Sequence, residues 1–158
     1  PARPGRHAGA AGGGVVKVLF LCTGNACRSQ MAEAWARHLF PAGWEVASAG
    51  LLTSPVSRRA DAVMREVGLD LDGQRSQSID EMDLAAFDLV VTLSEEAVRY
   101  LPALPDPRRH WPRPFQDPMG ATGTPEQVRE AFRTGRERAR AVVAEVVAHH
   151  GDPGATVS

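Results

Sequence analysis

The feature that most limits the fold of this chain is an apolar segment followed directly by a short polar loop and a helical pattern. Residues 15–22 read VVKVLFLC, a nearly continuous apolar run that is typical of a strand in the centre of a parallel sheet. The loop TGNACR follows, and from Ser29 large apolar residues recur at every fourth position as far as Leu39, which predicts a helix over 29–40. A strand, a tight loop and a helix in this order predict a βα unit.

The rest of the chain continues to alternate between strand-like and helical segments. Apolar runs and helical spacings are separated by turns, and capping pairs open two of the helices. Because strands that alternate with helices form βαβ units, we expect an α/β fold, a four-stranded parallel sheet with helices on both faces. The expected elements are strands at 44–50 and 88–93, an edge strand at 108–115, helices at 57–68 (stopped by Gly68) and 78–87 (capped by Ser78 and Glu81), a helical turn at 95–101, and a long last helix capped by Thr124 and Gln127.

Length and charge narrow the class of protein. A chain of 158 residues is long enough to bury one substantial core, so we expect a single domain at 15–150. Segments 1–14 and 151–158 are expected to be a flexible extension and a flexible tail. The formal net charge is −1, and without a cluster of Lys and Arg neither nucleic acid nor a membrane surface is an expected partner. We expect a monomer.

Cysteine content and hydropathy indicate the compartment. The chain has two cysteines, Cys22 and Cys27, which are too few for a disulfide framework. No apolar stretch approaches the roughly 20 residues that span a bilayer, and segment 1–14 lacks the apolar core of a secretory signal. The sequence therefore predicts a protein of the reducing cytoplasm.

The loop between the first strand and the first helix is suited to binding an oxyanion. Ligands of open α/β sheets bind beyond the carboxyl ends of the strands, where Cys22 is expected. The loop can turn its main-chain N–H groups inward beside the helix N-terminus and form an anion nest, with Gly24 supplying a positive φ. Arg28 can close this nest with a planar guanidinium that matches two oxygens of a tetrahedral anion. The predicted binding residues are Thr23, Gly24, Asn25, Ala26, Cys27 and Arg28.

Cys22 is the predicted nucleophile of this site. Helix N-termini and cationic neighbours lower the pKa of a cysteine thiol, and the hydroxyl of Ser29 can donate a hydrogen bond that favours the thiolate further. The alternative is that Cys22 merely ends a buried strand and that Arg28 is a surface residue. The C-x5-R-S spacing between a strand and a helix favours a catalytic thiolate that attacks a phosphate ester, a phosphoprotein or arsenate.

Several motifs together resemble one known family. The stretch CTGNACRSQMAEAW begins at Cys22 and is followed by SAG at 48–50, DLVVTL at 88–93, HW at 110–111 and DP at 117–118. This set is similar to the low-molecular-weight protein tyrosine phosphatase superfamily and, within it, to arsenate reductases coupled to thioredoxin or to low-molecular-weight thiols. The resemblance implies the fold of that family over essentially the whole folded part of the chain.

The resemblance also implies roles for individual residues. Cys22 is the nucleophile, Arg28 clamps the oxyanion, and the main-chain amides of 23–28 hold the substrate. Asp117 is the general acid. That role also makes chemical sense unaided, because a hydroxide that leaves arsenic, or an alkoxide that leaves phosphorus, needs a proton. On its own, Asp117 is equally consistent with a turn-forming residue before Pro118.

One departure from the thioredoxin-coupled reductases concerns the source of electrons. Those enzymes use two further cysteines in the segment after the third strand, whereas this chain has Ser94 and Leu101 at the matching positions. Cys27 lies inside the loop, where bending toward Cys22 would disrupt the anion nest. We therefore expect Cys27 to be a small packed side chain rather than a resolving thiol, with a protective Cys22–Cys27 disulfide as the alternative.

The predicted function is a single-cysteine arsenate reductase that serves arsenic detoxification. An external thiol (mycothiol, bacillithiol or glutathione) takes over the arsenic or sulfur centre, and a glutaredoxin-like protein or a thioredoxin system regenerates it. One alternative is a phosphatase that hydrolyses phosphate monoesters with the same cysteine, and weak phosphatase activity is expected in either case. Another is a non-catalytic oxyanion-binding protein, which Asp117 disfavours. A shortage of aromatic residues to line a phosphotyrosine slot argues against the phosphatase: the large candidates are Tyr100, Trp35, Trp44 and Trp111, and of these Trp35 and Trp44 are expected in the core.

No metal and no bound cofactor are expected. In some reductases of the family, the residues that match Asn25, Glu33 and Ser48 frame a potassium site. Here Arg75 and Gln77 occupy the other positions of that site, and a cation beside Arg75 is unfavourable. The spacing of Cys and His residues fits no zinc site. The arginines of the last helix, between 129 and 140, alternate with glutamates and indicate a solvated helix face.

Overall fold

Strand and helix formation follows the apolar pattern along the chain. The computed structural model describes residues 16–150. Its strands are β1 (Lys17–Cys22), β2 (Glu45–Gly50), β3 (Leu89–Thr92) and β4 (His110–Pro112), and its helices are α2 (Arg28–Leu39), α3 (Arg58–Arg65), α4 (Glu95–Tyr100) and α5 (Pro125–His150). The extension and the tail expected at 1–14 and 151–158 lie outside the described residues.

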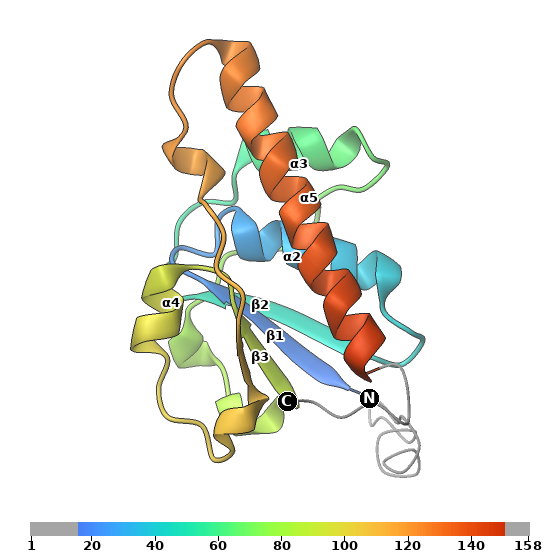
Figure 1. Ribbon diagram of the computed structural model, residues 1–158, viewed down its shortest axis with the longest axis vertical. Coiled ribbons are helices and arrows are strands. Elements are labelled where there is room, and N and C mark those ends of the chain that lie inside the picture. The colour runs from blue at the N-terminus through green and yellow to red at the C-terminus, as the bar shows by residue number, and fades with distance from the viewer. Residues whose placement is uncertain (1–15, 151–158) are drawn as a thin grey trace.

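The strands form one parallel sheet in the order β2-β1-β3-β4 (Figure 1). β1 pairs with β2 on one side and with β3 on the other, and it is buried along nearly its whole length because its side chains are apolar on both faces. The carboxyl ends of parallel strands meet at one edge of the sheet, so Cys22 lies where the loops after several strands converge. The expected α/β fold with a four-stranded parallel sheet is confirmed.

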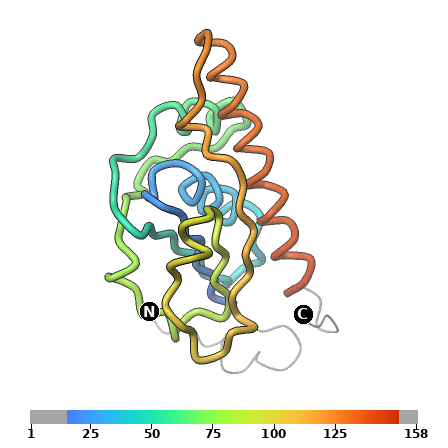
Figure 2. The backbone as a smooth tube through the Cα atoms, turned by 60° about the vertical axis from the view of Figure 1, so that its left-hand side comes forward, coloured from blue at the N-terminus to red at the C-terminus, as the bar shows by residue number. Residues whose placement is uncertain are grey.

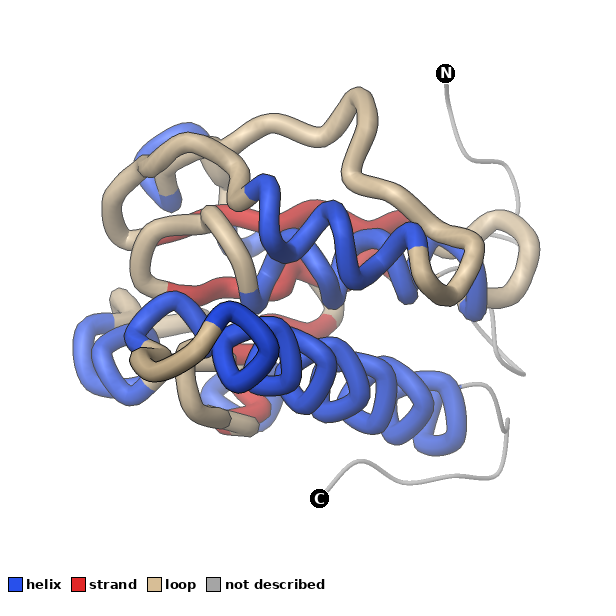
Figure 3. The backbone as a smooth tube through the Cα atoms, turned by 90° about the horizontal axis from the view of Figure 1, so that it is seen from above, coloured by secondary structure: helices blue, strands red, loops and turns tan. Residues whose placement is uncertain are grey.

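Helices cover both faces of the sheet, as Figure 3 shows. On one face α2, α3 and α5 enclose the larger core, in which Phe20, Met31 and Phe132 are buried. On the other face α4 and the segment 78–87 cover a smaller cluster around Leu21. Both faces are therefore shielded, which leaves the loop-bearing edge of the sheet as the place for polar chemistry.

Segment 78–87 is not the continuous helix that its capping pair predicts. The capping box of Ser78 and Glu81 is present, but it opens only a 3-10 turn, Ile79–Glu81, and a second 3-10 turn follows at Leu84–Ala86. A continuous helix would turn Leu84 away from the face that its apolar neighbours share. Two short turns with an extended break between them let all of these side chains pack on the sheet: Ile79, Met82, Leu84 and Phe87.

Two further elements are shorter than expected. α3 ends at Arg65, and Gly68, which was expected to stop it, has the left-handed φ of 82° in the turn that follows. β4 is an edge strand of three residues within the expected range 108–115. Its shortness follows from the prolines in that range, which cannot donate ladder hydrogen bonds.

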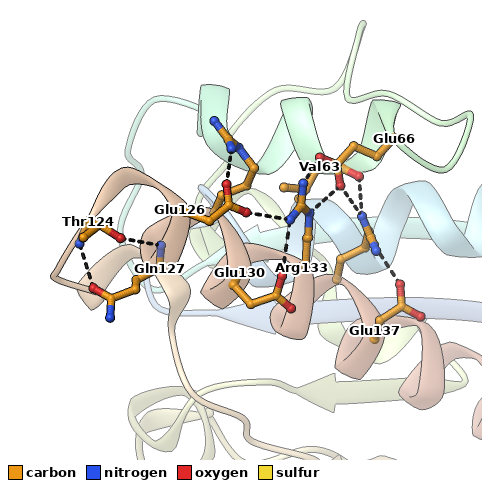
Figure 4. A network of polar contacts seen from close by, with 10 residues as sticks. Val63, Glu66, Thr124, Glu126, Gln127, Glu130, Arg133 and Glu137 are labelled. Carbon is orange, nitrogen blue, oxygen red and sulfur yellow. Dashed lines mark hydrogen bonds and ion pairs between the residues drawn. The ribbon is translucent and has the colours of Figure 1, made fainter.

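The connection from β4 rises beside α5 to the start of that helix, as Figure 2 shows. Within it, Pro118 packs directly on the backbone of α5, because a Cβ at Gly135 would lie 2.6 Å from the ring of Pro118. This contact fixes the position of the preceding residue, Asp117. At the top of the connection, Thr124 and Gln127 accept hydrogen bonds from each other's main-chain N–H groups (Figure 4), which confirms the expected cap of α5.

A network of ion pairs joins α3 to α5 (Figure 4). Arg133 donates to both carboxylate oxygens of Glu66 at 2.9 and 2.8 Å, and Arg136 donates to Glu66 and to the carbonyl of Val63. The expected solvated face is confirmed for the exposed Arg129, Arg138 and Arg140. It is wrong for Arg133 and Arg136, which are turned toward α3. Among the described residues, no helix is both long enough and apolar enough to cross a membrane.

Candidate active site

The loop between β1 and α2 is held in place by its carbonyl groups. A peptide whose carbonyl faces one side presents its N–H group to the other side. The loop amides are therefore directed away from segment 51–57, which is the arrangement that an anion nest requires. Main-chain N–H groups of residues 51–57 donate hydrogen bonds of 2.9 to 3.1 Å to the carbonyls of Cys22, Thr23, Gly24 and Ala26.

The backbone adopts its left-handed conformation at Asn25 and not at Gly24. Asn25 has a φ of 49°, in a region that asparagine tolerates better than most residues, and it is the only residue other than glycine with a positive φ in the described chain. The expectation that Gly24 supplies the positive φ is therefore wrong. Gly24 is instead a point of close approach, since a Cβ there would lie 3.1 Å from Oγ of Ser54.

Hydrogen bonds of the Asn25 side chain explain why this residue holds the unusual φ. Its Oδ1 accepts the main-chain N–H of Gln77 at 2.8 Å. Its Nδ2 therefore faces the other way, where it donates to the hydroxyls of Ser29 and Ser48 at 2.7 and 3.0 Å. The side chain is fully buried, and its contacts are those of a residue that fixes the shape of the loop.

The end of β2 leaves room for the loop only because residue 50 is glycine. A Cβ on Gly50 would lie 2.7 Å from the main-chain nitrogen of Asn25 and 2.3 Å from the carbonyl oxygen of Leu52. Both neighbours are backbone atoms, which cannot move aside as a flexible side chain could. The glycine of the SAG motif is thus required by the close packing of two backbones.

The thiol of Cys22 is within hydrogen-bond distance of the Ser29 hydroxyl. Its Sγ lies 2.8 Å from Oγ of Ser29. Because Oγ of Ser29 already accepts from the amide of Asn25, its own hydrogen is free to point at the sulfur. Ser29 thus lies beside the sulfur, where its hydroxyl can donate to a thiolate.

Arg28 begins α2, and its guanidinium is held by two carbonyls and a carboxylate. Nη1 donates to the carbonyl of Phe115 at 3.0 Å and approaches that of Leu93 at 3.5 Å. Nη2 lies 3.4 Å from Oδ2 of Asp117. Only 9% of the side chain is exposed, so Arg28 is a buried, positioned cation beside the nest and not the surface arginine of the alternative interpretation.

The position of Asp117 is compatible with both roles considered from its sequence context. Its Oδ1 accepts the main-chain N–H of Met119 at 3.0 Å and opens the 3-10 turn Pro118–Gly120. Its other carboxylate oxygen faces Arg28, and 44% of its side chain is exposed. A carboxyl group anchored by a turn at the open side of Arg28 is placed to protonate a leaving group of an anion in the nest.

A cavity of about 620 Å³ opens beside Arg28. Asp117 and Phe115 line it from the connection after β4, and Glu95 and Glu96 line it from α4. Sequence reasoning missed Phe115, Glu95 and Glu96. They could have been found, because they follow the carboxyl ends of β3 and β4 at the edge where Cys22 lies. The lining contains none of the aromatic residues that the sequence suggested, Tyr100, Trp35, Trp44 and Trp111.

Thr23 ties the loop to α4. Its Oγ1 lies 3.0 Å from Oγ of Ser94 and 3.0 Å from Oε1 of Glu96. A carboxylate can only accept, so the Thr23 hydroxyl donates to Glu96 while the Ser94 hydroxyl donates to Thr23. Hydrogen bonds from its own main-chain N–H and from Thr23 hold the pKa of Glu96 below its usual value. Ser94 also caps α4 by accepting the N–H of Ala97 at 3.0 Å.

Cys27 packs into the core beneath the loop. It is 3% exposed and belongs to the same apolar cluster as Met31. Burial, and then the nearby charge of Asp117, raise the pKa of its thiol far above the usual value. Both cysteines are free thiols, but a neutral, buried thiol is a poor nucleophile. The position of Cys27 favours the packing role that the sequence suggests.

The residues that match the potassium site of some reductases bond to one another here. Ser48 accepts from Asn25 and donates to Glu33 at 2.6 Å, while Glu33 pairs with Arg37. Within residues 16–150, no three Cys, His, Asp or Glu side chains are grouped so that they could hold a metal ion.

Comparisons with known sequences agree with this geometry. The family model for low molecular weight phosphotyrosine protein phosphatase matches residues 17–151. A protein named arsenate reductase from Halalkalibacterium halodurans is 43% identical over 122 residues, which cover 76% of this chain and 86% of that protein.

Comparisons with solved structures lead to the same family. An arsenate reductase in the phosphate-binding state has a TM-score of 0.71 at 34% identity and covers 85% of this chain and 98% of that one. A low molecular weight protein tyrosine phosphatase from T. tengcongensis has a TM-score of 0.70 at 28% identity, with 84% and 98% covered. With the family model matching residues 17–151 and the C-x5-R-S loop and the sheet order in place, the chain belongs to the low molecular weight phosphotyrosine protein phosphatase family, in which it resembles proteins named arsenate reductase.

Proposed function

We propose that this protein is an arsenate reductase that uses Cys22 as its only redox-active thiol and takes its electrons from an external thiol. The observation that carries the proposal is the convergence of four side chains, Cys22, Arg28, Ser29 and Asp117, on one loop that can hold a tetrahedral oxyanion. The relative named arsenate reductase at 43% identity and the similar structure in a phosphate-binding state support arsenate as the anion.

In the first step, the thiolate of Cys22 attacks the arsenic atom of arsenate. An S–As bond forms while one As–OH bond breaks, and Asp117 supplies the proton with which that hydroxide leaves as water. Arg28 and the loop amides hold the remaining oxygens and their negative charge. Arsenic is still pentavalent after this step.

An external thiolate then completes the reduction by one of two routes. It attacks Sγ of Cys22, so that an S–S bond forms, the electron pair of the S–As bond moves to arsenic, and trivalent arsenite leaves. Alternatively it attacks arsenic, displaces Cys22 as a thiolate, and carries the arsenic away for a second thiol to reduce. Both routes oxidise two thiols to a disulfide, which a glutaredoxin-like or thioredoxin-like protein reduces.

The external thiol is proposed because the chain offers no second usable one. The sequence contains two cysteines, and Cys27 is buried with a raised pKa. Ser94, at the position of a relay cysteine in the thioredoxin-coupled reductases, is used to cap α4. Such a reductase depends on a pool of reduced thiols, so we propose that it acts in the cytoplasm and serves arsenic detoxification.

The test is the formation of arsenite from arsenate by the purified protein. The reaction is run with mycothiol, bacillithiol, glutathione or thioredoxin, each with its own reducing system and NADPH. We expect arsenite with at least one of these systems, its loss in Cys22→Ser, and its retention in Cys27→Ala. Turnover that persists in Cys22→Ser would refute the mechanism.

Hydrolysis of phosphate monoesters by the same cysteine is the second candidate. The specific observation in its favour is Phe115, which gives the cavity an aromatic wall. Here a phospho-cysteine would form with Asp117 protonating the departing alkoxide, and water would hydrolyse it. Turnover of an aryl phosphate with no arsenite from any thiol system would establish this function in place of the reductase, whereas weak turnover beside arsenite formation is expected of the reductase itself.

A further inference from the structure

We propose that Glu95 and Glu96 select the reductant, by disfavouring thiols that carry carboxylates and admitting an uncharged thiol that bears hydroxyl groups. The inference rests on the proposed function, which it deepens by naming the chemical class of the electron donor. It concerns residues of α4 that the reaction itself does not use.

The charge of the cavity lining is the first argument. The lining contains one cation, Arg28, and three carboxylates, those of Glu95, Glu96 and Asp117. Arg28 is paired with Asp117 at 3.4 Å and, like Arg99 of α4, also attracts Glu96, but the carboxylates of the lining still outnumber its one cation. The hydrogen bond from Thr23 helps to keep Glu96 ionised. The lining is therefore acidic on the side formed by α4.

Access is the second argument. Cys22 is only 2% exposed, and the cavity opens on Thr23, Arg28 and Asp117, which flank the nest. A thiol that approaches the nest through this cavity passes Glu95 and Glu96. Each negative charge on that thiol is repelled by both carboxylates, and arsenic-bound oxygens add to the repulsion.

The hydrogen-bonding character of the walls is the third argument. Carboxylates accept hydrogen bonds from hydroxyl groups, and the opposite wall offers the apolar surfaces of Pro114 and Phe115, with Gln116 beside them. A volume of about 620 Å³ suits a ligand of disaccharide size. Of the low-molecular-weight thiols named above, mycothiol is polyhydroxylated and has no carboxylate, whereas glutathione and bacillithiol carry carboxylates.

The experiment measures thiol–disulfide exchange at Cys22 without arsenate. The native protein is labelled with dipyridyl disulfide, intact mass confirms one label, and an added thiolate then attacks the mixed disulfide and releases thiopyridone. The probes are three small thiols of similar size and different charge: cysteamine, 2-mercaptoethanol and 3-mercaptopropionate. Rates are divided by the thiolate concentration and by the rate with a pyridyl disulfide of free cysteine, which removes the intrinsic reactivity of each thiol.

We expect the normalised rates to fall in the order cysteamine, 2-mercaptoethanol, 3-mercaptopropionate. Two carboxylates within about 8 Å of an anionic thiol should slow it roughly tenfold against the neutral one at low ionic strength, and added salt should shrink the difference. The double variant Glu95→Gln/Glu96→Gln should abolish it, while the amide oxygen at position 96 can still accept from Thr23. The matched control, Glu130→Gln/Glu137→Gln, removes two exposed carboxylates of α5 outside the cavity and should leave the order unchanged.

Mycothiol and glutathione are compared in the same assay as probes of natural size. A normalised rate for mycothiol well above that for glutathione, lost in the Glu95→Gln/Glu96→Gln variant, supports the proposal. Equal rates for charged and neutral thiols, or a preference that survives in that variant, would overturn it. Because this assay needs no arsenate, a charge preference without arsenite formation would refute the reductase and leave the selection by charge standing.

Discussion

The side-chain amide of Gln30 donates to two main-chain carbonyls. One is that of Asn25, in the loop between β1 and α2, at 3.0 Å, and the other is that of Arg75 at 3.2 Å. Gln74 completes the arrangement by donating to Oε1 of Gln30 at 2.8 Å. Gln30 is fully buried. The left-handed turn at Asn25 is thus secured from outside the loop, by an amide on the first turn of α2.

Replacement of Gln30 by leucine should weaken both the fold and the nest. The change leaves one buried carbonyl, that of Asn25, and one partly buried carbonyl, that of Arg75, without their partner. We therefore expect a loss of about 2 kcal/mol in the free energy of unfolding, measured by urea denaturation. Inorganic phosphate should then protect Cys22 less well against iodoacetamide. Gln74→Leu, which spares both carbonyls, is the matched control and should have the smaller effect. Full stability of Gln30→Leu would show that the bridge is unimportant.

Replacement of Ser29 by alanine should make Cys22 less reactive at neutral pH. The thiolate would lose a hydrogen-bond partner at its sulfur, and we expect alkylation by iodoacetamide to slow by roughly tenfold at pH 7. Ser57→Ala, which removes the cap of α3, is the control for a general loss of stability. An unchanged rate in Ser29→Ala would contradict this hydrogen bond.

Alkylation of the native protein should stop after a single modification. Burial and nearby negative charge keep Cys27 protonated at neutral pH because they raise the pKa of its thiol. Intact mass should therefore show one adduct, at Cys22, with the second appearing only in denaturant. Cys27→Ala should keep the rate of modification and lose about 1 kcal/mol of stability from the vacated space. Rapid native modification at Cys27 would instead favour a redox role for it.

Stability at acidic pH should depend on Glu66. Hydrogen bonds from Arg133, and then from Arg136, lower the pKa of this carboxyl from 4.5 to about 2 in the folded protein. Because the folded pKa is the lower one, the unfolded state binds more protons between these values. The contribution is complete above pH 4.5 and is lost as pH falls toward 2. In Glu66→Gln the melting temperature should therefore change less between pH 5 and pH 3 than in the native protein.

Local patterns were enough to predict the core of the site. The run that ends at Cys22, the C-x5-R spacing and the periodicity of α2 are contiguous, so strand, loop and helix follow from neighbouring residues. Placement of Arg28 and Ser29 beside the thiol follows from the same unit. Asp117 needed the family resemblance, because a single Asp-Pro pair is also a common turn.

Features that depend on distant segments could not be predicted. The φ of Asn25 is set by bonds to residues 48 and 77 that no local pattern reveals. The break in segment 78–87 depends on the sheet that it covers, and the position of Arg136 depends on α3. The acidic side of the cavity is built where α4 meets the connection after β4, so it appears only once the sheet order is known.

The hydrogen bonds from Ser94 through Thr23 to Glu96 have a consequence for engineering. Cysteines placed at positions 94 and 101 would supply the two further thiols of a thioredoxin-type relay, but they would not by themselves make the relay work. The substitution at 94 removes both the cap of α4 and one hydrogen bond that holds the loop between β1 and α2. The hydrogen bond from Thr23 to Glu96 still joins this loop to α4. Conversion to that electron supply therefore means redesigning residues 23, 94 and 96 as one unit.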